Sequence, residues 1–296
     1  MLPSTYGWTS DPPPRLILMA NHLRTEKKLA IIATLVEGCS VRSAERLTGV
    51  HRDTICRLLV RVGEGCAALL DERMIDLGCK RLELDELWSF VAKKQRTVRE
   101  IDNTARVGDQ WVYVAIDAET KLIPAYLVGK REARNTNMFV ADLAARLRNR
   151  VQLSTDGLRQ YVEAIEQAFG SEVDYAQIVK TYEAEPAGEG RYSPPNVSST
   201  EKTPIAGSPV AELVSTSYVE RNNLNIRMST RRFTRLTNAF SKKLENHVAA
   251  VALYVAHHNF VRRHTTTRVT PAMAAGVESS MWSMGELLEA AEALAS

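Results

Sequence analysis

The stretch SYVERNNLNIRMSTRRFTRLTNAFSKK, residues 217–243, decides how the rest of the chain is interpreted. Four apolar residues recur in it at every seventh position: Val219, Ile226, Phe233 and Phe240. This spacing predicts one apolar face of a helix. At ~100° per residue, Glu220, Arg227 and Arg231 fall in one sector beside that face. The pattern therefore predicts a carboxylate held among cations at the edge of a buried surface.

The same stretch carries many cations and, after Glu220, no acidic residue. The cations are Arg221, Arg227, Arg231, Arg232, Arg235, Lys242 and Lys243. A run of like charges is usually a solvated helix face. The alternative is a surface for a polyanion with chemistry at Glu220, and that alternative needs further carboxylates elsewhere in the chain.

Composition describes an ordinary globular protein with local segregation of charge. The 296 residues are 45% hydrophobic and 25% charged, which predicts one large domain and a smaller module. The net charge is only +3, so a nucleic-acid surface must come from local clustering. Residues 221–268 provide it, with ten Lys or Arg against the single acid Glu245.

The cysteines and the apolar runs limit the compartment and the partners. None of the four cysteines forms a C-x-x-C pair, which argues against a zinc ribbon and suits a reducing compartment. The longest apolar run, Val248–Ala256, is too short to span a bilayer. We therefore expect a cytoplasmic protein without a membrane partner.

The N-terminal part predicts a leader followed by a DNA-binding module. Residues 1–25, with three consecutive prolines, are expected to be disordered. Residues 26–66 predict a helix-turn-helix module. Its helices are expected at Glu26–Val36, from the N-cap Ser40 to Gly49, and at His51–Val62, with residues 63–79 as a linker.

The third of these helices has a polar outer face. Asp53, Thr54, Arg57 and Arg61 point away from its apolar residues, and Arg52 lies in the first turn. A recognition helix meets base edges in the major groove with such a face, so Arg52, Thr54 and Arg57 are the expected DNA-binding residues. The alternative is a trihelical packing unit that does not bind DNA.

Residues 80–268 alternate between strand and helix patterns, which predicts an α/β domain with a mixed sheet. Residues 183–209 are rich in Pro, Gly, Ser and Glu and predict a flexible excursion, and residues 269–296 predict a tail with a short acidic helix. The expected strands are Arg81–Val91, Trp111–Ile116, Leu122–Val128, Val151–Gly157 and Tyr175–Tyr182; the expected helices are Asn135–Arg150, Leu158–Phe169, Lys242–Arg263 and Trp282–Ala295.

Carboxylates in this domain suit a metal-dependent reaction. Asp85 lies inside a strand, Asp156 at a strand end and Glu220 on the later helix. Three such acids beside a basic surface could hold two Mg²⁺ ions about 3.5–4 Å apart around a phosphodiester. Glu86 and Asp117 compete on chemistry alone, although Asp117 is explained more simply as a hairpin-turn residue. Asp156 could also be an N-cap.

Three motifs resemble those of the DDE transposases of the bacterial insertion-sequence-one family. They are LDELW at 84–88, TDG at 155–157 and YVERNNLNIR at 218–227. The corresponding motifs of the family are D-E-x-W, T-D-G and E-R-x-N-L-x-x-R, in the same order. The resemblance covers about residues 81–268. It implies a ribonuclease-H-like core with Asp85, Asp156 and Glu220 as ligands of two Mg²⁺ or Mn²⁺ ions, and with Arg227 near the DNA ends.

Two features depart from the family. The Cys-rich finger that some members carry is absent, and residues 183–209 lengthen the connection before Glu220. Neither changes the three acids.

The sequence thus predicts a DNA transposase that cuts and joins double-stranded DNA at element ends and targets. Arg231, Arg232 and Arg235 are expected to contact phosphates near the cleavage point. Acting on two ends implies a homodimer or a larger synaptic assembly, associated with the bacterial nucleoid. The alternatives are an inactive DNA-binding regulator derived from a transposase and a general ribonuclease-H-like nuclease.

Overall fold

The computed structural model describes residues 23–182, 197–234 and 237–295. The predicted disorder of residues 1–25 falls almost entirely outside these ranges, and α1 begins at Thr25. Three helices come first: α1 (Thr25–Val36), α2 (Val41–Thr48) and α3 (Arg52–Arg73). Ser40 caps α2 as expected, since its side chain accepts the N–H of Ser43. Gly49, with φ of 70°, ends α2 and opens the turn into α3.

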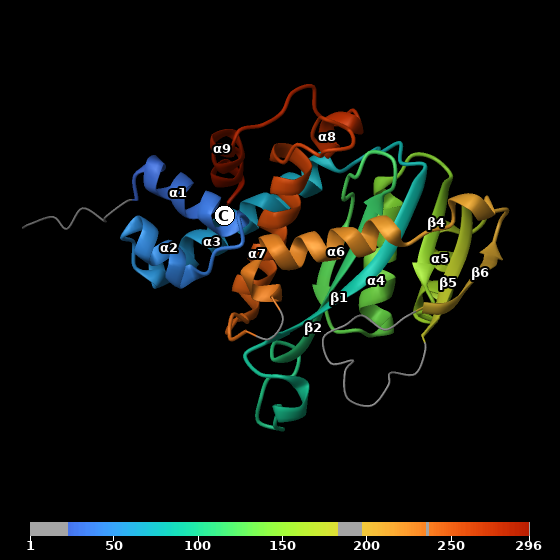
Figure 1. The fold of residues 1–296 in the computed structure, drawn as a ribbon, viewed down its shortest axis with the longest axis horizontal. Coiled ribbons are helices and arrows are strands. Elements are labelled where there is room, and N and C mark those ends of the chain that lie inside the picture. The colour runs from blue at the N-terminus through green and yellow to red at the C-terminus, as the bar shows by residue number, and fades with distance from the viewer. Residues whose placement is uncertain (1–22, 183–196, 235–236, 296) are drawn as a thin grey trace, which may run out of the picture.

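A mixed six-stranded sheet follows, in the order β3-β2-β1-β4-β5-β6 (Figure 1). β1 is antiparallel to β2 and parallel to β4, and β4 is parallel to β5. The strands are β1 (Arg81–Val91), β2 (Gly108–Asp117), β3 (Tyr126–Gly129), β4 (Val151–Asp156), β5 (Val173–Tyr182) and β6 (Val197–Ala206). β1 therefore lies in the middle of the sheet, with neighbours on both sides.

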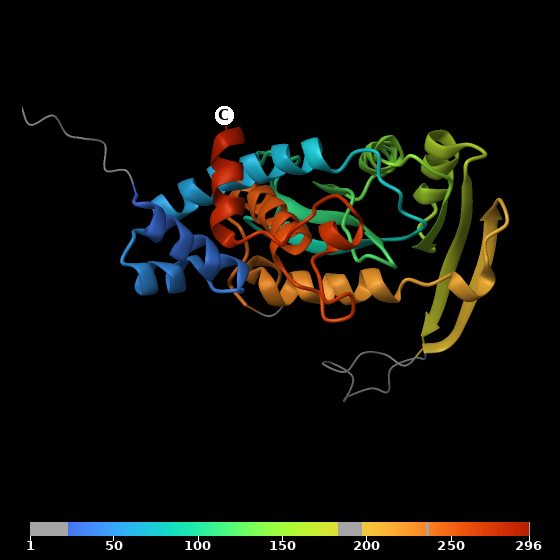
Figure 2. The ribbon, with the colours of Figure 1, turned by 90° about the horizontal axis from the view of Figure 1, so that it is seen from above.

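Helices cover both faces of this sheet. α4 (Ala133–Arg146) and α5 (Gln160–Phe169) lie on one face, and α6 (Ser217–Ser229) crosses the other (Figure 2). α7 (Leu244–Ala256) packs against α3 at the end of the sheet nearer the N-terminal helices. This mixed sheet between helices, after an α-helical region, confirms the predicted ribonuclease-H-like fold class.

Short elements complete the chain. They are the 3-10 turns η1 (Gln95–Thr97), η2 (Ala211–Leu213) and η3 (Arg231–Phe233), the π-helical turn η4 (His257–Val261), α8 (Pro271–Ala274) and α9 (Met284–Leu294). Ser283 and Glu286 form a capping box at the start of α9. None of the helices in the described part of the chain is both long enough and apolar enough for a membrane crossing.

The third helix is longer than predicted. α3 continues through the expected linker to Arg73, across the proposed boundary at residue 66. Gly63 and Gly65 are buried where neighbouring helices approach closely: a Cβ on Gly63 would lie 2.4 Å from Ala249 Cβ, and one on Gly65 would lie 1.8 Å from Ala291 O. These glycines allow α7 and α9 to pack on α3 and do not end the helix. The division into domains stays a prediction.

The helix that carries Glu220 is shorter than the heptad pattern predicted. α6 ends at Ser229, and Thr230 has an extended backbone. Phe233 lies on η3, where its ring is buried and packs 4.9 Å from the ring of His247. The apolar repeat thus predicted which residues are buried, but not one continuous helix. Arg231 lies beyond the end of α6 and does not share a helix face with Glu220.

Part of the predicted flexible excursion is a strand. Val197–Ala206 forms β6, which pairs antiparallel with β5 along most of its length. Its residues are mostly exposed, so the polar composition reflects an edge strand and does not mean a lack of structure. Residues 183–196 of the excursion lie outside the described ranges.

Two smaller corrections concern element ends. The strand expected at Leu122–Val128 begins only at Tyr126, because Pro124 lacks an N–H and Asn259 bonds both backbone groups of Ile123. The helix expected at Asn135–Arg150 ends at Arg146, whose guanidinium binds Asp142 and Asp71.

Candidate active site

The alternation of side chains along β1 distributes its acids over two faces of the sheet. Glu83 and Asp85 face α6: Glu83 Oε2 accepts the backbone N–H groups of Tyr218 and Val219, and Asp85 Oδ2 accepts from Asn223 Nδ2 at 2.7 Å. Glu86 faces the opposite layer. The adjacent acids predicted from LDELW thus serve two sides of one strand.

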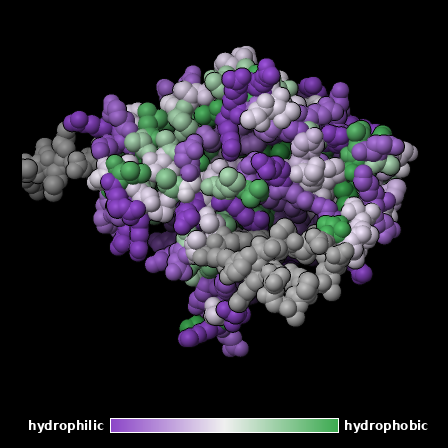
Figure 3. Space-filling model, in the orientation of Figure 1, coloured by the Kyte–Doolittle hydropathy of each residue, from purple (hydrophilic) through white to green (hydrophobic). Residues whose placement is uncertain are grey.

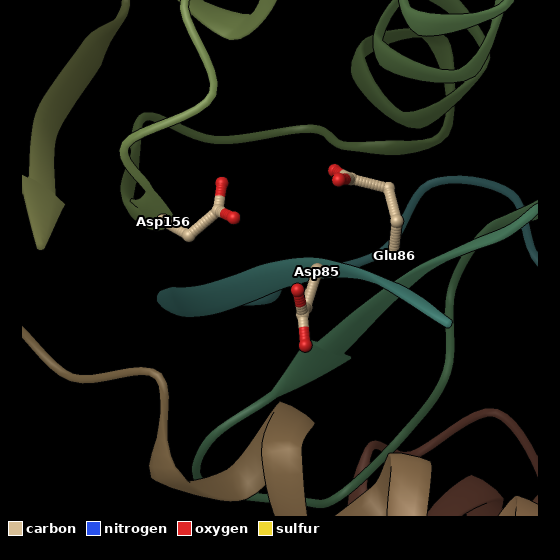
Figure 4. Close-up of side chains that lie close together, drawn as sticks. All are labelled: Asp85, Glu86 and Asp156. Atoms are coloured by element: carbon tan, nitrogen blue, oxygen red, sulfur yellow. The ribbon is translucent and has the colours of Figure 1, made fainter. Parts of the chain in front are cut away.

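Three carboxylates meet where β1 and β4 stop pairing. The parallel ladder between these strands ends at Leu84 and Thr155, and Asp85 and Asp156 are the next residues on each strand. Oxygen atoms of Asp85, Glu86 and Asp156 lie within 4.8 Å of one another (Figure 4). The end of the β1–β4 ladder therefore brings together two of the three predicted acids and adds Glu86.

Glu220 lies beside this cluster and is not part of it. Its side chain is 48% exposed in the first turn of α6, where it pairs with Lys180 and accepts from Thr216 Oγ1 at 2.7 Å. The Glu220 charge contributes to the raised pKa of Asp85, which places the two carboxylates in electrostatic reach. In this structure the cation that pairs with Glu220 is Lys180 of β5.

Glu86 is held by a cation. Its side chain is 1% exposed and pairs with Arg131, whose Nη2 is 3.1 Å from Oε2. The same Nη2 lies 3.9 Å from Asp156 Oδ2, and the guanidinium sits over the ring of Trp111 at 4.8 Å. Arg131 thus connects Glu86 with Asp156. Glu86 Oε1 is buried and has no hydrogen-bond partner among the described residues.

Burial and mutual repulsion raise two pKa values in the cluster. Burial raises the pKa of Asp85 to about 6, and the charges of Asp156 and Glu220 add to the rise. Burial also raises the pKa of Glu86 to about 7. The nearby Tyr161 hydroxyl opposes this rise, although its oxygen forms no hydrogen bond of normal geometry with a described residue. Crowded, half-desolvated carboxylates of this kind are stabilised by a cation.

The donor set fits a hard divalent cation. Mg²⁺ and Mn²⁺ prefer carboxylate oxygens, and Asp85 and Asp156 present them at an opening between two diverging strands. The unpartnered Glu86 Oε1 adds an oxygen beside them. Asp117, the competing acid of the sequence, is instead buried in a turn, where it accepts from Glu119 and Thr120.

Glu83 and Asn223 position α6, and neither was identified from the sequence as a residue of the site. Glu83 supplies the capping acceptor for the second and third residues of α6, whose own N-cap Thr216 makes no capping bond. Asn223 ties the helix to Asp85. The alternation L-E-L-D was the available signal, because it puts Glu83 and Asp85 on one face.

The predicted DNA-binding residues fall in two places. Arg52 and Arg57 are exposed near the start of α3, and Thr54 is half-buried and accepts from Arg57 at 3.1 Å. Arg227 is in the last turn of α6 and Arg231 begins η3. Arg232 turns inward and donates to Asn246 O at 2.7 Å. Arg235 lies outside the described residues.

Comparison with known proteins gives no family for this chain. No family model and no curated protein matches the sequence. Solved structures found by shape include a Mos1 transposase paired-end complex with the left transposon end, at 13% identity and a TM-score of 0.21, covering 55% of this chain and 60% of that one. A Mos1 strand transfer complex has 13% identity and a TM-score of 0.23, covering 85% and 81%.

In the paired-end complex and in two further Mos1 structures, a pre-cleavage transpososome and a paired-end complex with Mn, the match spans only about three fifths of the length of the Mos1 chain. The TM-scores are far below those of superimposable folds. The fold assignment accordingly rests on the order and direction of the strands.

Proposed function

We propose that this protein is a DNA transposase that cleaves a phosphodiester bond at the end of a mobile element and joins the freed end to target DNA. The observation that carries the proposal is the meeting of Asp85 and Asp156 just past the point where β1 and β4 stop pairing, with Glu220 on α6. The resemblance of the three motifs to DDE transposases of the insertion-sequence-one family supports it.

The residues of the site would have separate tasks. Asp85, Asp156 and Glu220 would hold two Mg²⁺ or Mn²⁺ ions, which supply charge stabilisation at the phosphate and an activated oxygen nucleophile. Glu220 would leave Lys180 to do so. Arg131 would keep Asp156 oriented through its contact with Glu86.

The proposed reaction has two steps at one site. Water attacks phosphorus and the bond to the 3′-oxygen breaks, which leaves a 5′-phosphate and a 3′-hydroxyl. That hydroxyl then attacks a target phosphate, so one phosphodiester forms as another breaks. The second step makes the protein a transposase and distinguishes it from a general nuclease.

The helical region would find the DNA. Arg52, Thr54 and Arg57 would read the element end from α3, while Arg227, Arg231 and Arg235 would neutralise phosphates near the cut. Because two ends must be cut together, we propose that the protein works as a homodimer or larger assembly in the bacterial nucleoid.

Cleavage of a labelled duplex from the flanks of the protein's own gene, with Mg²⁺ or Mn²⁺, tests the proposal. We expect metal-dependent nicking that Asp85→Asn, Asp156→Asn and Glu220→Gln each reduce by at least ~100-fold, because each would remove a charge used in the transition state. DNA binding by the variants should stay near that of the wild type.

Glu132→Gln changes an exposed acid next to Arg131 in sequence and outside the cluster, so it is the control and should cleave normally. Cleavage that persists after chelation, or in the Asp85 variant, would defeat the metal site. Nicking without any joined product would show that the protein is a nuclease and not a transposase.

A further inference from the structure

A hollow of about 630 Å³ lies beside β1, beyond the carboxylate cluster. It opens between the last residues of β1 and the segment that connects α6 with α7. Ala92 N–H donates to Ser241 O at 2.8 Å where this segment crosses the end of the strand. The residues that give the hollow its chemistry are Trp88, Phe90, Phe240, Lys94, Arg96 and Arg232.

Aromatic rings form a continuous part of its wall. The ring centroids of Trp88 and Phe90 are 5.8 Å apart, and those of Phe90 and Phe240 are 4.8 Å apart. All three side chains are half-buried, so one side of each remains accessible. Aromatic residues at the end of a strand would normally be covered by the core. A row left open to a hollow offers flat apolar surface to a planar group.

Cations without counterions surround these rings. Arg232 donates to a backbone carbonyl, and no carboxylate in the described part of the chain pairs with it. Lys94 and Arg96 are exposed and likewise form no ion pair with a described acid, whereas Lys93 is held by Asp102. A half-buried arginine without a carboxylate partner offers its charge to an anion from outside the chain. The loop that bears Lys94 and Arg96, at the bottom of Figure 1, is largely hydrophilic (Figure 3).

We propose that this hollow binds an unstacked base of the DNA strand that enters the active site, with the base against Trp88 and Phe240 and the adjoining phosphates on Arg232, Lys94 and Arg96. Flat aromatic surface beside a basic rim is the combination that holds single-stranded DNA. The inference rests on the proposed function, since it takes the substrate to be DNA.

The spacing along β1 suits this role. Trp88 is two residues from Glu86 on the same face of β1, or about 7 Å at the rise of a strand. That length matches about two steps of stacked DNA. A nucleotide near the reacting phosphate would thus reach the hollow once it leaves the helical stack, and holding it there would keep the end of the duplex open.

Fluorescence anisotropy with two matched probes tests the inference. One is a labelled 20-base-pair duplex with a six-nucleotide single-stranded thymidine tail, and the other has the same tail built of abasic sites. Both carry equal phosphate charge, but only the first can stack. We expect wild-type protein to bind the thymidine tail at least ~5-fold more tightly than the abasic tail.

Trp88→Ala should remove this preference, and Trp88→Phe should keep most of it, since a ring remains. Arg232→Gln should weaken binding of both probes alike. A preference that survives in Trp88→Ala and in Phe240→Ala would overturn the inference, even if the metal-dependent cleavage is present. Failure of the wild type to bind either probe would overturn it together with the proposed function.

A second copy of the chain is the competing occupant. Light scattering of Trp88→Ala without DNA separates the two cases. Dissociation of a wild-type oligomer, with the thymidine preference unchanged, would make the hollow a contact between copies and overturn base binding. An unchanged oligomeric state together with a lost preference supports it.

Discussion

Glu83 shows how one buried carboxylate can position a helix of the candidate site. It is fully buried in β1, yet it completes the N-terminus of α6 by accepting two backbone N–H groups, and its charge suits the positive end of a helix. Burial raises its pKa, and the hydrogen bonds from Val219 and Tyr218 oppose that rise. The residue thus couples the strand of Asp85 to the helix of Glu220.

Removing this carboxylate should cost stability. Glu83→Ala leaves the buried N–H of Val219 and the part-buried N–H of Tyr218 without their acceptor, and a buried unsatisfied group costs about 1–3 kcal/mol. Urea denaturation should therefore show a lower free energy of unfolding, and DNA cleavage should fall because α6 loses its anchor. Glu119→Ala, at an exposed acid in a turn, should change stability by less than about 0.5 kcal/mol. If the two variants are equally stable, the capping role of Glu83 is wrong.

Helix packing depends on how closely α3, α7 and α9 approach. Gly63 faces Ala249 and Gly65 faces Ala291, so small residues on both sides bring the backbones together. This contact joins the helical region to the rest of the core. One cluster of buried residues accordingly extends from Ile31 in α1 to Ala291 in α9.

Gly63→Ala tests this contact. Alanine favours a helix over glycine by about 1 kcal/mol, so on an open surface the change would stabilise. Here the new Cβ would lie 2.4 Å from Ala249 Cβ, and overpacking should cost about 1–3 kcal/mol and reverse the sign. Thermal denaturation should give a lower Tm for Gly63→Ala. Glu64→Ala, one position along and exposed, should leave Tm within a few degrees. A Tm for Gly63→Ala at or above that of the wild type would contradict the close approach.

Across the whole molecule, lowering the pH has opposite effects on stability through the buried histidines of the helices and through the buried carboxylates of the sheet. Burial lowers the pKa of His247 to about 3 and those of His257 and His258 to about 4. Below pH 6.5 these histidines are protonated in the unfolded chain but stay neutral in the folded protein. The free energy of unfolding therefore falls as the pH drops from 6.5 to about 4. The raised pKa values of Asp85 and Glu86 have the opposite effect, because the folded protein holds those protons more tightly.

His258→Gln isolates the histidine contribution. His258 lies fully inside the core and bonds Lys121 O at 2.8 Å, a contact that a glutamine amide can replace. The variant should be less stable than the wild type at pH 7.5. Between pH 6.5 and 4 its stability relative to the wild type should improve by about 1.4 kcal/mol per pH unit. Urea denaturation at several pH values measures this slope. A constant difference between the two proteins across that range would show that His258 does not resist protonation.

Local chemistry along the chain determined most of the elements and the positions of two of the predicted acids. Alternating apolar residues predicted the strands that carry Asp85 and Asp156, and the strand-to-loop change at TDG predicted the place of Asp156. The cap Ser40 and Gly49 predicted the turn before α3. These features depend on neighbours in sequence, so a single sequence is enough to reveal them.

Only the tertiary structure decided what depends on partners distant in sequence. Gly63 does not end a helix, because it lies where Ala249 of α7 packs closely on α3. Residues 197–206 form a strand because they pair with the free edge of β5. The fold also placed Glu86 with Asp85 and Asp156, and Glu220 beside Lys180, because strand register and helix docking set those distances. Residue types and their order define which groups are available for chemistry, whereas the packing of remote segments decides which of them meet.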